Sequence, residues 1–98
     1  MPQAIYRYAF DPEVPAEEIE ATLFLSILGA ECLHGETQVR LDAAHVLDLA
    51  SRTCVIDAGT TVGSAINRLF AGFVTREFGT DAFQVDRVET ERAELLTA

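Results

Sequence analysis

The chain has 98 residues, and sixteen acidic groups against seven basic ones give it a formal net charge of -9 at pH 7. This length supplies one hydrophobic core, so we expect a single domain over residues 1–98 in which 89–98 form a polar C-terminal tail. Proteins that bind nucleic acids usually concentrate basic residues on one face, so this excess of negative charge argues against DNA or RNA as a partner.

The apolar stretches and the cysteines indicate the cellular environment of the chain. The longest uncharged apolar stretch, residues 21–30, is about half as long as a bilayer crossing requires. The first residues lack the charged and apolar regions of a secretory signal. Two cysteines, Cys32 and Cys54, do not make a disulfide framework. We therefore expect no membrane partner and a cytoplasmic location with both thiols reduced.

Residues 4–10 have the pattern of a first strand. Tyr6, Tyr8 and Phe10 occupy alternate positions and would share the face that meets the helices. Pro12 ends the pattern, because proline has no N–H to donate to a strand ladder.

The longest amphipathic segment predicts a helix over residues 16–34 that ends at Gly35. Its apolar residues fall on two opposite faces when they are placed about 100° apart around a helix axis. One face must cover the sheet, and Gly29 would let another backbone approach the second face closely. The first face carries Ile19, Leu23, Ile27 and Ala30. The second face, which we call the outer stripe, carries Ala21, Phe24, Leu25, Leu28 and Cys32.

An apolar face that the domain itself does not cover commonly marks a protein interface. We therefore expect the outer stripe to pack against a second copy of the chain or against another protein. The alternative is that a loop or the C-terminal tail of the same chain covers it.

The segment over residues 38–49 alternates apolar and polar side chains, which predicts a long half-buried strand. After a short polar turn, residues 53–57 have the β-branched character of the return strand of a hairpin. A turn centred on residues 50 and 51 would pair His45 with Ile56 and Leu47 with Cys54, all on the core face.

The rest of the chain supplies one more helix and one more strand. Thr60 and Thr61 offer hydroxyl caps to a helix over residues 61–78, and residues 82–88 alternate as a last strand. The order strand, helix, strand, strand, helix, strand has one common compact solution when crossovers are right-handed. We therefore predict an α+β fold: the ferredoxin-like βαββαβ two-layer sandwich, with an antiparallel sheet and both helices on one face.

Potential metal ligands are poorly arranged in this sequence. Cys32 and His34 stand near each other, but zinc sites normally show paired ligands at CxxC or HxxxH spacing. The acidic residues between positions 11 and 18 could form a cation site, although the glutamates among them also suit the positive N-terminal end of a helix dipole. We expect no metal and no cofactor.

Two polar regions could bind a small anion or carboxylate. Residues 57–64 join a strand to a helix N-terminus and present N–H groups and hydroxyls, but they lack the lysine and the glycine spacing of a phosphate loop. The sheet face away from the helices, which we call the open sheet face, could hold an anion between two arginines. Arg7 and Asp57 on that face could instead pair with each other across neighbouring strands. The candidate ligand-binding residues are Arg7, Arg40, Asp57, Thr60, Thr61 and Ser64.

No pair of acid, base or nucleophile has a spacing typical of a catalytic site, and no GxSxG or HExxH motif is present. We therefore name no catalytic residue and expect association rather than catalysis. The first interpretation is a domain that self-associates, or binds a protein partner, through the outer stripe or the open sheet face. The alternative is a regulatory module for an anion or carboxylate, with an enzyme of unknown reaction less favoured.

Overall fold

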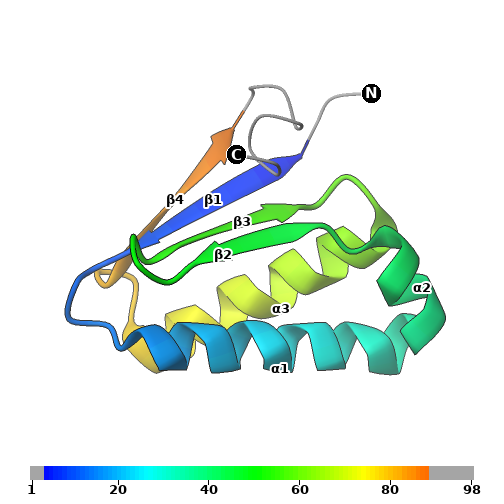
Figure 1. Ribbon diagram of the computed structural model, residues 1–98, viewed down its shortest axis with the longest axis horizontal. Helices are drawn as coiled ribbons and strands as arrows, with labels where there is room; N and C mark the ends of the chain where they lie inside the picture. The colour runs from blue at the N-terminus through cyan, green and yellow to red at the C-terminus, as the bar shows by residue number, and fades with distance from the viewer. Residues whose placement is uncertain (1–3, 89–98) are drawn as a thin grey trace.

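A computed structural model describes residues 4–88 of the chain, so the predicted tail at 89–98 lies outside the described residues. The chain forms a four-stranded sheet and three helices (Figure 1). The elements in order are β1 (Ile5–Phe10), α1 (Ala16–His34), α2 (Glu36–Asp42), β2 (His45–Asp48), β3 (Thr53–Asp57), α3 (Thr61–Phe78) and β4 (Phe83–Val88).

The sheet has the strand order β2-β3-β1-β4, and every neighbouring pair is antiparallel. Figure 1 shows α1 and α3 side by side against one face of the sheet. An antiparallel sheet can leave its second face uncovered by helices. The predicted α+β class with a four-stranded antiparallel sheet is confirmed. None of the helices between residues 4 and 88 combines the length and the apolar character that a membrane span needs.

The predicted long strand over residues 38–49 is wrong in its first half, which forms α2. The alternation there has no buried face to support a strand, because Val39 is buried but Leu41 is 73% exposed. Side-chain pairs at helical spacing stabilise the segment instead. The amide of Gln38 donates to the Asp42 carboxylate at 2.6 Å, and Arg40 Nη2 lies 3.7 Å from Glu36 Oε1. Arg40 and Asp42 therefore belong to a helix and not to the open sheet face.

The predicted register of the β2–β3 hairpin is confirmed, since His45 pairs with Ile56 and Leu47 with Cys54. Cys54 and Ile56 are buried and Leu47 is half-buried. The expectation that His45 is a core residue is wrong, because β2 is an edge strand and His45 stays exposed there.

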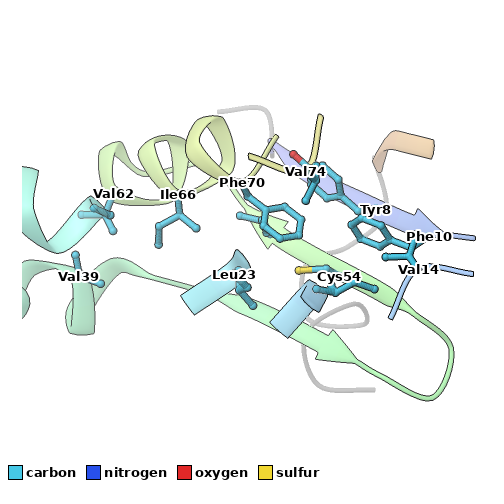
Figure 2. Close-up of a cluster of buried hydrophobic side chains, with 13 residues drawn as sticks. Tyr8, Phe10, Val14, Leu23, Val39, Cys54, Val62, Ile66, Phe70 and Val74 are labelled. Carbon is cyan, nitrogen blue, oxygen red and sulfur yellow. The ribbon is translucent and has the colours of Figure 1, made fainter. Parts of the chain in front are cut away.

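The core lies between the sheet and the helices and is centred on aromatic packing (Figure 2). Tyr8 makes an edge contact with Phe70, with ring centroids 4.9 Å apart, and its hydroxyl donates to Asn67 Oδ1 at 2.6 Å. Burial raises the pKa of Tyr8, so the phenol stays protonated. Tyr8 and Phe10 confirm the predicted inward face of β1, and Tyr6 packs beside them partly buried.

Candidate interaction surface

Helix α1 packs onto the rest of the chain with the face that the sequence predicts, and its opposite face is exposed. Phe24 is 66% exposed, Leu25 48% and Leu28 56%. Ala21 and Cys32 complete the outer stripe and are exposed as well. None of residues 4–88 covers these side chains, so the interface set that we predicted is available to a partner.

The buried face of α1 also contains two hydroxyl residues, Thr22 and Ser26. The Ser26 hydroxyl donates to the Thr22 carbonyl at 2.8 Å, so its polar group is satisfied within the helix. This face alone anchors α1 to the core. The apolar residues of the outer stripe are therefore not required for that packing.

The expected role of Gly29 in a partner interface is wrong. A Cβ placed on Gly29 would lie 2.9 Å from Leu69 Cδ1 on α3. The missing side chain thus makes room for a contact between two helices of the same chain, and another backbone is not involved. Sequence alone could not place α3 on that side of α1.

A pocket lies between one flank of α1 and the edge strand β2, with a volume of about 270 Å³. Its walls are mostly apolar, and Phe24 belongs both to this pocket and to the outer stripe. Partial burial of the His45 ring lowers its pKa below the ordinary value for histidine, so the ring is neutral at pH 7. We call this feature the β2 pocket; it is lined by Glu20, Leu23, Phe24, Ile27, His45 and Leu47.

The polar groups of the predicted anion loop serve the loop itself. Asp57 Oδ1 accepts the Gly59 N–H at 2.8 Å, and Thr60 Oγ1 accepts the Gly63 N–H at 2.9 Å as the cap of α3. Thr61 is exposed at the start of α3, and Ser64 is half-buried one turn later. These groups hold the end of β3 against the start of α3.

The two arginines predicted to bind an anion together do not share a face. Arg7 lies on the open sheet face of β1, whereas Arg40 lies on α2. The cross-strand neighbours of Arg7 are Val55 and Asp86, while Asp57 stands opposite Ile5. The six residues of the predicted ligand set are therefore divided among the sheet, α2 and the start of α3.

Cysteine, histidine and acidic side chains form no group of three or more suited to a metal ion within residues 4–88. Glu17 and Glu18 lie in the first turn of α1, where the helix dipole favours them. Cys32 is exposed, and Cys54 is buried in the core, where burial raises the pKa of its thiol to about 12.

Comparison of the chain with protein-family models, curated proteins and solved structures found no match, so its function must be inferred from its own geometry.

Proposed function

We propose that the chain is a small cytoplasmic protein-interaction domain that forms a homodimer through the outer stripe of α1. The observation that carries the proposal is the run of exposed apolar side chains on successive turns of one helix, Phe24, Leu25 and Leu28. Single exposed apolar residues are ordinary, but a contiguous apolar patch usually has a binding role.

We also propose that the fold is ferredoxin-like. With α2 set aside, the element order is strand, helix, strand, strand, helix, strand. This order supports a ferredoxin-like sandwich in which α2 is inserted between the first helix and the hairpin.

The composition of the two available faces favours α1 over the open sheet face. The exposed residues of the open sheet face include the polar Arg7, Gln84 and Asp86, whereas the apolar Ile5 and Val55 on the same face are buried. Removing such charged groups from water costs free energy unless each finds a partner. The outer stripe contains no charged residue. Apolar burial stabilises an interface by about 25 cal/mol for each Å² removed from water, so contact through α1 is the better supported arrangement.

Charge gives the proposed dimer a recognisable salt dependence. Each copy carries a formal charge of -9, so two copies repel each other at long range. Salt screens this repulsion, with a Debye length of about 10 Å at 0.1 M ionic strength. We expect the dimer population to rise with protein concentration and with ionic strength.

The deciding experiment measures the molar mass of the full chain by sedimentation equilibrium at several concentrations. We expect the Leu25→Glu, Leu28→Glu double variant to sediment as a monomer while its far-UV circular dichroism stays helical. Leu41→Glu is the matched control, because Leu41 is also exposed but lies on α2. A wild type that is monomeric at every concentration, or a control that dissociates as fully as the double variant, would contradict the proposal.

A further inference from the structure

The outer edge of β2 presents backbone groups that no described strand pairs. Asp57 donates its N–H to the Ala44 carbonyl at 2.9 Å, which identifies these residues as a hydrogen-bonded pair of the ladder. Because such pairs alternate along antiparallel strands, the N–H and C=O groups of His45 and Leu47 point away from β3. Edge strands are commonly protected by lysine, by proline or by short length; β2 contains no lysine or proline and has four residues.

The β2 pocket lies on the sheet face toward which the side chains of His45 and Leu47 point. An added strand would have part of its side chains on this same face. The side chains of His45 and Leu47 line the pocket from the sheet, and those of Phe24 and Ile27 line it from α1. Side chains alternate along a strand, so every second residue of an added strand would point toward this pocket. Its volume of about 270 Å³ lies just below the range of about 300–1,000 Å³ for small-molecule sites. The pocket therefore suits a single anchoring side chain.

Two acidic residues lie along the flank of α1 that lines the pocket. Glu20 lines the pocket, and Glu31 lies one helical turn beyond Ile27 on the same flank. A rise of about 1.5 Å per residue places Glu20 and Glu31 about 16 Å apart along the helix axis. In an extended peptide, residues i and i+4 share a face and are separated by about 14 Å. Two basic residues around a central apolar residue match this spacing.

We propose that β2 is a docking edge for an extended segment of a partner protein with the pattern basic, any residue, leucine or isoleucine, any residue, basic. The segment adds a fifth strand beside β2, and its central side chain enters the β2 pocket. Its basic residues lie toward Glu20 and Glu31, and the net charge of -9 on the chain favours approach of a cationic segment. This site shares only Phe24 with the outer stripe and needs no second copy of the chain, so it does not rest on the proposed homodimer.

The test uses the fluorescein-labelled peptide Thr-Arg-Val-Leu-Val-Arg-Thr, capped at its C-terminus, and the full chain in an anisotropy titration. We expect saturable binding of this peptide. A peptide with glutamate in place of both arginines should bind about tenfold more weakly, because its charges would face acidic side chains. A peptide with an N-methyl group on its leucine should also bind about tenfold more weakly, because it cannot donate that backbone N–H to the strand edge.

Matched protein variants locate the site. Glu20→Arg should weaken binding of the arginine peptide about fivefold and strengthen binding of the glutamate peptide. Glu18→Arg carries the same change of charge on the opposite flank of α1 and should leave both affinities near those of the wild type. In nuclear magnetic resonance spectra, the amides of His45 and Leu47 should shift on titration and gain protection from hydrogen exchange.

Three results would overturn the proposal. The first is binding that does not saturate, or that does not distinguish the arginine and glutamate peptides. The second is an equal effect of Glu18→Arg and Glu20→Arg. The third is protection of the His45 and Leu47 amides in the free protein that rises with its concentration, because a second copy would then occupy the edge. The homodimer proposal is judged separately, by the mass of the Leu25→Glu, Leu28→Glu variant.

Discussion

Replacing Gly63 with alanine should destabilise the chain, because the start of α3 lies directly against the end of β3. A Cβ at this position would overlap the Asp57 backbone carbonyl oxygen and would lie 3.1 Å from both the Asp57 carbonyl carbon and Thr60 Oγ1. Neither neighbour can rotate away, since one is backbone and the other is the hydroxyl that caps α3. Overpacking of this kind costs about 1–3 kcal/mol, and alanine returns at most about 1 kcal/mol in a helix. We expect a net loss of about 1–2 kcal/mol.

Two other glycines in helices provide internal controls for this prediction. Gly72 lies in α3 and is exposed, and a Cβ there would have no neighbour within 4 Å. Gly72→Ala should therefore stabilise the chain by about 1 kcal/mol through helix propensity. Gly29→Ala would press on the flexible end of Leu69, which can shift, so its effect should fall between the other two.

Urea unfolding at one low protein concentration would measure all three variants, because self-association would otherwise change the apparent stability. With a slope of about 1–3 kcal/mol per molar urea, the Gly63→Ala loss corresponds to a midpoint lower by about 1 M. The reasoning would be refuted if Gly63→Ala unfolded at or above the wild-type midpoint, or if Gly63→Ala and Gly72→Ala changed stability by the same amount.

Thiol reactivity and pH dependence give two further predictions. In the native chain, Ellman's reagent should react rapidly with Cys32 alone, because burial raises the pKa of the Cys54 thiol to about 12; rapid reaction of both thiols before denaturation would contradict this. Partial burial of the His45 ring lowers its pKa, so the unfolded chain binds a proton that the folded chain does not as pH falls through about 6.5. Urea unfolding between pH 7.5 and 5.5 should show that the free energy of unfolding decreases as the pH is lowered, and that it decreases less steeply in His45→Gln. Equal slopes in the two proteins would count against the lowered pKa.

Sequence was sufficient for the two long helices. Their apolar spacing, the Thr60 cap and the glycine at position 35 predicted the observed bounds of α1 and α3. It was insufficient for residues 36–42, because a short segment that alternates polar and apolar residues can also form a helix when only one side chain must be buried. Val39 meets that need alone, and the pairs from Glu36 to Arg40 and from Gln38 to Asp42 stabilise the helical spacing.

The two candidate surfaces also differ in how far the sequence predicts them. The outer stripe was predictable, because all of its residues lie on one helix and their relation follows from helical periodicity. The β2 pocket was not predictable, because its walls come from two elements distant in the sequence. Glu20 and His45 approach only when β2 takes the edge position over α1. A pattern within one element contains no information on that placement.

Phe24 connects the two proposed surfaces, since its side chain is part of the outer stripe and also a wall of the β2 pocket. A second copy packed on the outer stripe and a peptide anchored in the pocket would therefore both contact the same ring. If one of these contacts changes the position of the ring, it changes the affinity for the other, and thermodynamic linkage requires the two effects to be equal. A peptide that binds the monomer better would shift the chain away from the dimer, and dimerisation would weaken peptide binding by the same factor. If both surfaces are used as proposed, the shared position of Phe24 makes self-association and partner binding depend on each other.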